Sequence, residues 1–177
     1  FKELYCALKD MGMILTLNTN GTLINEEWAE FFAKNKPRRI NITLYGSKNE
    51  TYENLCHMKD GFDKTIRGIE LLKKYKIDVK INGSLVKKNF HDRMEIIDIG
   101  EKYDIPVRID TYMYPSVRER TTPFNFQERL NPEDAAKARV EILHREMGDE
   151  LFEQYAKQTI YLAEHTEEGD ACPGHMT

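Results

Sequence analysis

Polar and mostly uncharged side chains cluster at the ends of four apolar segments of this sequence. The clusters are Thr19-Asn20-Gly21, Thr43 to Ser47, Asn82-Gly83-Ser84 with Asn89, and Asp110 to Tyr114 with Arg118. In the first three, hydroxyl and amide groups prevail, which suits a polar ligand held by hydrogen bonds better than general acid–base catalysis. A structural interpretation competes with this one, because Asn-Gly is a frequent turn pair and threonine at position 43 also fits strand propensity.

The three cysteines, at positions 6, 56 and 172, form no metal-binding or disulfide pattern. CxxC and HExxH spacings do not occur, nor do the phosphate-binding loops GxGxxG and GxxxxGK. Cys56 is followed by His57, but adjacent side chains on a helix point about 100° apart. This predicts a partly buried thiol rather than a pair of ligands. Cys172 follows the last predicted helix in an exposed turn, where a free surface thiol is the simplest interpretation, and so few cysteines favour a reduced, cytoplasmic setting.

The elements that must position these residues alternate between helix and strand. Strands are predicted at Met13–Leu17, Ile40–Leu44, Val79–Val86 and Pro106–Met113. Helices are predicted at Phe1–Met11, after the capping residue Asn25, at Thr51–Cys56, Phe62–Leu72 and Met94–Tyr103, after the cap Asn131, and at Asp149–Ala163. Alternation at this spacing predicts right-handed crossovers and a parallel sheet.

Four parallel strands are too few to close an eight-stranded barrel, so the α/β fold is either an open sheet or one part of a larger barrel. The first helix has no capping residue before Phe1, and the chain stops at Thr177 without an element to end on. We therefore expect a partial (β/α) barrel whose chain continues at both ends.

Composition excludes several classes of function. The 177 residues include 26 Lys plus Arg and 30 Asp plus Glu, a net charge of -4, which argues against a nucleic-acid-binding domain. No segment approaches the roughly 20 apolar residues that span a bilayer. Residues 1–130 carry a balance of +3, whereas residues 131–177 carry -7. The change coincides with a switch to helices alone and predicts two parts, residues 1–130 and a helical connector at 131–177.

Four segments in order resemble the middle of radical S-adenosylmethionine enzymes. They are LNTNGTLI from Leu17, INITLYGS from Ile40, Thr51-Tyr52-Glu53 and the helix from Gly61 to Leu72. The likeness is greatest to members with a SPASM-type C-terminal extension, including peptide-modifying maturases and sulfatase-maturing enzymes. It covers residues 1–130, and 131–177 is similar to the connector toward that extension.

This resemblance implies a fold and a chemistry. The four strands would be the third to sixth of a partial (β/α)6 barrel that holds S-adenosylmethionine and a [4Fe-4S] cluster. Reductive cleavage of the cofactor gives a 5′-deoxyadenosyl radical that abstracts hydrogen from a substrate, here a peptide or protein, with an electron donor as a second partner. The family's CxxxCxxC loop does not occur in this sequence, so the resemblance places the cluster ligands outside it and implies that this chain alone is inactive.

The resemblance also assigns roles to single residues. Thr43 corresponds to the polar residue of the fourth family strand, Tyr45 replaces the acid that many relatives carry, and Cys56 stands where many have an arginine. Cofactor contacts would come from Thr19, Asn20, Thr43, Tyr45, Ser47, Asn82 and Ser84. The substrate would meet Tyr112, Tyr114 and Arg118, and Cys172 would be the first ligand of an auxiliary [4Fe-4S] cluster.

Two other interpretations stay open. One is a non-catalytic scaffold that kept the half-barrel and lost the cluster. The other is an unrelated open α/β domain that binds a small polar ligand. Thr43 and Asn82 on opposite faces of the sheet would favour the unrelated domain.

Overall fold

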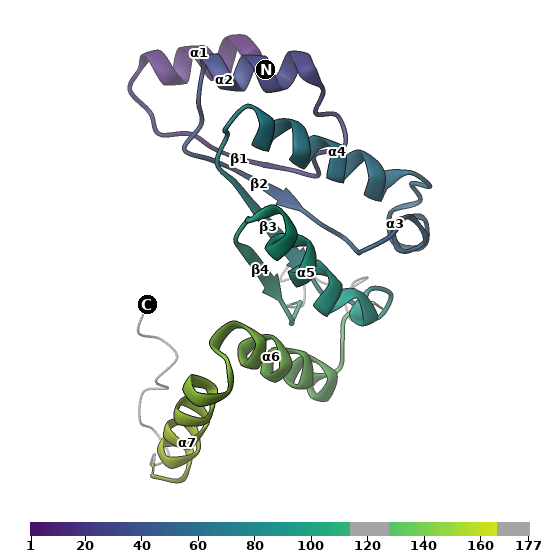
Figure 1. Ribbon diagram of the computed structural model, residues 1–177, viewed down its shortest axis with the longest axis vertical. Coiled ribbons are helices and arrows are strands. Elements are labelled where there is room, and N and C mark those ends of the chain that lie inside the picture. Colours follow the sequence, from purple (N-terminus) through teal and green to yellow (C-terminus); the bar gives the residue numbers. More distant parts are fainter. Residues whose placement is uncertain (114–127, 166–177) are drawn as a thin grey trace, which may run out of the picture. The chain divides into compact units, whose positions relative to one another are not determined.

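A sheet of four parallel strands in the order β1-β2-β3-β4 forms the core of the N-terminal part of the chain (Figure 1). The computed structural model describes residues 1–113 and 128–165. The strands are β1 (Thr16–Thr19), β2 (Arg39–Thr43), β3 (Val79–Ser84) and β4 (Val107–Asp110). The helices around them are α1 (Lys2–Asp10), α2 (Glu26–Lys34), α3 (Asn49–Cys56), α4 (Gly61–Lys74), the 3-10 turn η1 (Phe90–Asp92) and α5 (Arg93–Tyr103). The predicted α/β fold with parallel strands is confirmed.

Alternation along the strands gives the sheet two unlike faces. One face is apolar and carries Ile40, Ile42, Val79, Ile81 and Ile109, all buried. Helix α5 covers part of it, because a Cβ added at Gly83 would lie 3.8 Å from Ile96 Cγ2. The other face, called the polar face below, carries Asn18, Arg39, Asn41, Thr43, Lys80, Asn82, Ser84, Arg108 and Asp110.

The first strand begins three residues later than its apolar run predicts. Met13 and Ile14 are exposed, at 46% and 83%, and pairing starts only where Thr16 meets Arg39 of β2. Strand limits depend on where a neighbour offers hydrogen bonds, which hydrophobicity alone does not report. The third strand likewise ends at Ser84, because the Val86 N–H donates to the Asn89 side chain.

The predicted helix caps are confirmed. Asn25 Oδ1 accepts from the Trp28 N–H at 3.0 Å, and Asn131 Oδ1 accepts from the Asp134 N–H at 2.7 Å. Each bond satisfies one of the N–H groups that a helix leaves unpaired in its first turn. Local sequence therefore fixes where α2 and α6 (Pro132–Met147) begin.

The chain divides into two compact units, residues 1–138 and 139–177. The second unit contains the end of α6 and all of α7 (Asp149–His165). Gly148, at φ 74°, separates these helices, and His144 Nε2 lies 2.7 Å from Asp149 Oδ1 across the joint. Among the described residues, no helix is long and apolar enough to cross a membrane.

Candidate functional site

Thr43 and Asn82 lie next to each other on the polar face, at the carboxyl ends of β2 and β3. They are register partners in the parallel ladder, so their side chains share one face of the sheet. This arrangement is the opposite of the one that would favour an unrelated domain. In parallel α/β proteins, ligands bind beyond these strand ends.

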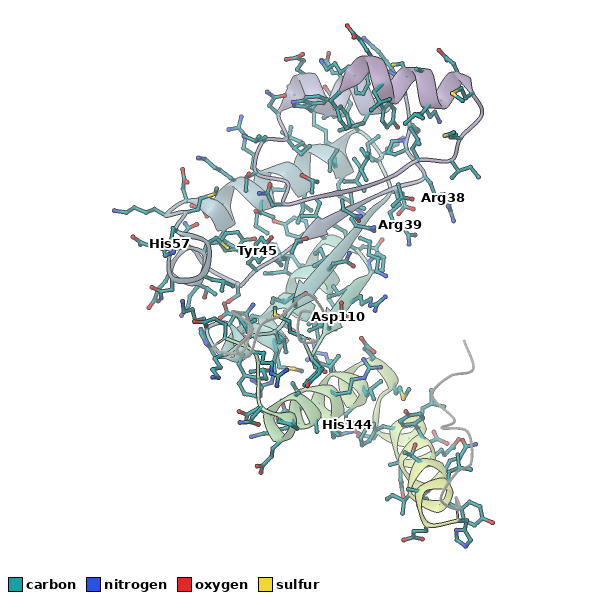
Figure 2. All side chains as sticks on the ribbon, turned by 180° about the vertical axis from the view of Figure 1, so that it is seen from behind. Arg38, Arg39, Tyr45, His57, Asp110 and His144 are labelled. Carbon is teal, nitrogen blue, oxygen red and sulfur yellow. The ribbon has the colours of Figure 1, made fainter. Side chains whose placement is uncertain are left out.

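The same face continues with residues from the neighbouring strands. Ser84 pairs in register with Asp110, and Asn82 pairs with Arg108. Arg108 Nη2 lies 3.0 Å from Asp110 Oδ1, so these two charges largely satisfy each other. Figure 2 labels Asp110 together with Arg39 from the same face. Asn18, Asn41, Lys80 and Arg108 were not predicted as site residues. Strict alternation from Thr43 and Asn82 would have placed Asn41 and Lys80 on this face, whereas Asn18 and Arg108 follow from strand register.

The polar groups of Thr43, Asn82 and Ser84 are available to a ligand. Within the residues that the structure describes, none of these three side chains makes a hydrogen bond. Thr43 and Asn82 are half-buried, whereas Ser84 is exposed. Hydroxyl and amide groups in this state can donate to and accept from a polar ligand without first breaking an internal bond.

The Thr19-Asn20-Gly21 turn uses its own side chains to hold itself. Thr19 Oγ1 accepts from the Gly21 N–H at 3.1 Å, and Asn20 Oδ1 accepts from the Thr22 N–H at 3.2 Å. Thr19 pairs with Ile42, which places its side chain on the apolar face, away from Thr43. The structure therefore separates the Thr19 side chain from the Thr43–Asn82 pair.

Tyr45 and Ser47 belong to the loop that follows β2. The Tyr45 ring packs edge-on against Tyr52, with the ring centroids 5.9 Å apart. Burial, with a smaller effect of the Cys56 thiol, raises the pKa of the Tyr45 hydroxyl above its ordinary value. Ser47 contributes its backbone N–H to a bond with the Asp92 carboxylate at 2.9 Å.

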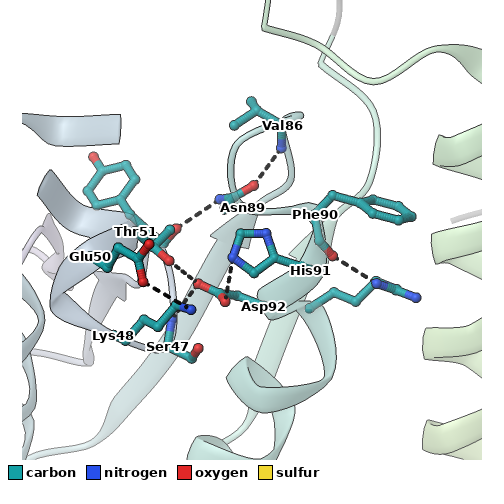
Figure 3. Close-up of polar contacts among 11 residues, drawn as sticks. Ser47, Lys48, Glu50, Thr51, Val86, Asn89, Phe90, His91 and Asp92 are labelled. Atoms are coloured by element: carbon teal, nitrogen blue, oxygen red, sulfur yellow. Dashed lines mark hydrogen bonds and ion pairs between the residues drawn. The ribbon is translucent and has the colours of Figure 1, made fainter. Parts of the chain in front are cut away.

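Two buried polar residues after β3, Asn89 and Asp92, hold the loop after β2 in place (Figure 3). Asn89 is fully buried; its Nδ2 donates to the Tyr45 carbonyl at 2.9 Å and to the Ser84 carbonyl at 3.1 Å. Its Oδ1 accepts from the Val86 N–H at 2.7 Å, so every polar atom of the amide is used. We call Asn89 and Asp92 together the loop clamp.

Asp92, 2% exposed, binds the other side of the same loop. Its Oδ2 accepts from the Ser47 N–H and from the Thr51 hydroxyl, the latter at 2.6 Å, and its Oδ1 lies 3.2 Å from His91 Nε2. A Cβ at Gly46 would lie 2.6 Å from Asp92 Oδ2, so only glycine fits there. Asn89 was predicted as part of the third cluster, whereas Asp92 was not predicted, because an aspartate just before a helix resembles an ordinary helix-capping residue.

Comparison with known proteins identifies the architecture around this site. The family model described as the radical SAM superfamily matches residues 1–100, more than half of the chain. The chain belongs to the radical SAM superfamily. Its four parallel strands are part of a radical SAM barrel, as the resemblance implied.

Individual relatives cover different parts of this radical SAM chain. An AdoMet-dependent heme synthase from Methanosarcina barkeri is 29% identical over 69% of the chain and 36% of its own length. A cysteine-type anaerobic sulfatase-maturating enzyme from Clostridium perfringens is 38% identical over 41% of the chain and 20% of its own length. The solved structure of native anSMEcpe with bound AdoMet and Cp18Cys peptide aligns at 26% identity and a TM-score of 0.58, over 72% of the chain and 35% of that protein. The chain thus spans about a third or less of the length of these relatives.

Of the remaining predicted site residues, the structure describes only Tyr112. Tyr112 is half-buried, with the Arg129 guanidinium 5.7 Å from its ring centroid. Tyr114, Arg118 and Cys172 lie outside the described residues. Within the described ranges, no group of three or more His, Cys, Asp or Glu side chains could hold a metal ion.

Cys56 is expected to be an unreactive thiol, consistent with its partial burial on α3. Burial raises the pKa of this thiol, so the thiolate that reacts with alkylating reagents is scarce at neutral pH. At pH 7.5 we expect iodoacetamide to modify Cys56 about tenfold more slowly in the folded chain than in urea, with the folded rate rising as pH increases. Peptide mass spectrometry over time measures both rates, and equal rates would show that Cys56 is an accessible, ordinary cysteine.

Proposed function

We propose that this chain forms the S-adenosylmethionine-binding wall of a radical SAM enzyme that modifies a peptide or protein. The observation that carries the proposal is the Thr43–Asn82 pair, adjacent on one face with its polar side-chain atoms available. Ser84, at the end of β3, and Tyr45 and Ser47, in the loop after β2, extend this wall. Thr19 and Asn20 then support the site by shaping the turn after β1.

The donor set fits the cofactor. S-adenosylmethionine presents ribose hydroxyls, an ammonium and a carboxylate, all of which accept or donate hydrogen bonds. A threonine hydroxyl and an asparagine amide each offer both a donor and an acceptor, so they match these groups without a charged partner. The cofactor, bound to a reduced cluster, supplies hydrogen-atom abstraction, and the protein's part is to bind, orient and exclude water.

Among the described residues, no group of three or more His, Cys, Asp or Glu side chains could act as the ligands of a catalytic cluster. We infer that they come from sequence outside this chain, and that residues 131–177 connect to a SPASM-type extension in which Cys172 is the first ligand of an auxiliary cluster. An electron donor would complete the set of partners. Residues 1–130 would then be the barrel part of the longer enzyme.

A peptide or protein substrate is supported by the sulfatase-maturating relatives and by the peptide-bound anSMEcpe structure. Tyr112, Tyr114 and Arg118 would meet it. A tetrapyrrole is the second candidate, favoured by the heme synthase likeness, which extends over 126 residues against 76 for the sulfatase-maturating enzyme.

Titration of the isotope-labelled chain with S-adenosylmethionine tests the proposed function. We expect NMR shifts concentrated at the backbone amides of Thr43, Asn82 and Ser84. Asn82→Ala should weaken binding by about tenfold, since it removes a side chain that hydrogen-bonds the ligand. Asn54→Ala, at an exposed position on α3, is the matched control and should leave the affinity unchanged. Shifts distributed elsewhere, or an affinity insensitive to Asn82→Ala, would contradict the proposal.

A further inference from the structure

We propose that the loop clamp, Asn89 with Asp92, is a positioning device that sets the distance between the ligand-facing ends of β2 and β3. The inference rests on the proposed function, because it concerns the same Thr43–Asn82 site. It adds two residues that need not touch the cofactor themselves. They act through the backbone that carries the residues which do.

The clamp joins the loop after β2 to the end of β3, at a point where the ladder between these two strands has ended. The last ladder bond between β2 and β3 runs from the Leu44 N–H to the Asn82 carbonyl, at 2.9 Å. Beyond it the strands are free to separate, and the Asn89 amide bridges the carbonyls of Tyr45 and Ser84. Each of these carbonyls lies two residues after one member of the Thr43–Asn82 pair. A single planar amide with two donors therefore fixes both strand ends at one separation.

Asp92 holds the next part of the loop against the start of α5. It gathers the Ser47 N–H from the loop and the Thr51 hydroxyl from α3 onto one carboxylate oxygen. Gly46 leaves the space that this approach needs. The β2 loop and the adjoining helix α3 are thus joined to the segment before α5, which lies more than 40 residues further along the chain, through Asp92.

A buried carboxylate is a costly way to obtain stability alone. The cost of its desolvation offsets much of the energy of its hydrogen bonds. Well-packed apolar residues in the same place often stabilise a fold at least equally. A fully satisfied polar network instead defines one geometry, since any displacement leaves a buried group unpaired. This property suits a binding site, where ligand contacts must be held to within about 0.5 Å.

Substitutions at Asp92 and Thr51 are expected to change the affinity for S-adenosylmethionine according to the number of clamp bonds that they remove. Asp92→Asn keeps an oxygen that can accept from both Ser47 and Thr51, so it should bind S-adenosylmethionine within about twofold of the wild type. Asp92→Ala leaves both donors unpaired and should weaken binding by about tenfold or more. Thr51→Val removes only one of the two bonds and should weaken binding by about threefold.

The experiment combines NMR titration of the full chain with urea unfolding of each variant. Glu95→Ala, an exposed acidic residue on α5, is the matched control. Affinity is compared under conditions where each variant is folded, and amide exchange at Ser47 reports whether the clamp has opened. If Asp92→Ala does not fold, the affinity of Thr51→Val for S-adenosylmethionine decides whether the clamp positions the site.

The outcomes are distinguishable. Weaker binding in Asp92→Ala and Thr51→Val, with recovery in Asp92→Asn, supports the clamp as a positioning device. Wild-type affinity in a folded Asp92→Ala or Thr51→Val overturns it and leaves Asp92 a structural residue. A wild-type chain with no S-adenosylmethionine shifts at Thr43 and Asn82 contradicts the proposed function itself, and the clamp inference with it.

Discussion

Replacing Asn89 with aspartate is expected to lower the free energy of unfolding by about 3 kcal/mol. The substitution keeps shape and volume, so no cavity or clash contributes. It exchanges the Nδ2 donor for an oxygen that faces the carbonyls of Tyr45 and Ser84, 2.9 and 3.1 Å from the present nitrogen. Two hydrogen bonds become two repulsive contacts, in a position with no exposed surface.

Protonation of the introduced carboxyl gives this prediction a pH dependence. In the folded variant, burial beside two carbonyl oxygens raises the pKa of that carboxyl above its unfolded value. The unfolded state therefore ionises first, and the destabilisation is fully present above the folded pKa. It should shrink as the pH falls from 8 toward 5, because the neutral carboxyl can again donate one hydrogen bond.

Urea unfolding followed by circular dichroism measures the loss of stability in Asn89→Asp at pH 8 and at pH 5. Asn54→Asp introduces the same change at an exposed position of α3 and should alter stability by no more than about 0.5 kcal/mol. A loss in Asn89→Asp no larger than in this control would mean that the Asn89 amide does not hold the strand ends. The bonds from Asn89 to Tyr45 and Ser84 would then contribute little to the fold.

Local sequence patterns predicted most of the elements but few of the contacts that assemble the site. The alternation of Ile40, Ile42 and Leu44 indicated both the strand and its buried face, and these residues are fully buried. That Thr43 and Asn82 are register partners came from the structure. The sequence predicted only that both lie at the carboxyl ends of parallel strands, because helices and strands alternate along the chain. These steps need only spacing and residue type.

The clamp could not be predicted in the same way. Asp92 meets Ser47 and Thr51 across 45 and 41 residues of sequence, and its burial follows from those distant partners. Locally, an aspartate before a helix is expected at the surface. The predicted start of β1 at Met13 was wrong for a related reason, because pairing with the first residue of β2 begins at Thr16.

Gly68 allows helix α4 to pack closely against the turn that follows β1. Gly68 lies in the interior of α4, where alanine usually stabilises by about 1 kcal/mol because it has less backbone freedom to lose. Here a Cβ would lie 2.5 Å from the Gly21 carbonyl oxygen and 3.3 Å from Ile24 Cβ. The nearer atom belongs to the backbone, which cannot rotate aside as a side chain could.

The same helix holds the turn by a second contact. The Thr65 hydroxyl, one turn of helix before Gly68, lies 3.1 Å from the Asn20 carbonyl and 2.8 Å from the Gly61 carbonyl of α4, so its one proton is shared between the turn and the helix. Gly21 itself has φ 74°, a conformation that glycine adopts without strain. The Thr-Asn-Gly turn is therefore held between its own side-chain bonds and α4, and it cannot shift without losing one of them.

Gly68→Ala is accordingly expected to destabilise the chain by about 2 kcal/mol, reversing the sign that helix propensity predicts. Arg67→Ala, one position earlier and exposed, raises helix propensity little and should change stability by less than about 0.5 kcal/mol. Urea unfolding of the two variants measures the difference. A Gly68→Ala variant as stable as wild type or more stable would show that the turn can move away from α4, and it would remove the reason for assigning the Thr19–Gly21 turn a fixed place beside the ligand site.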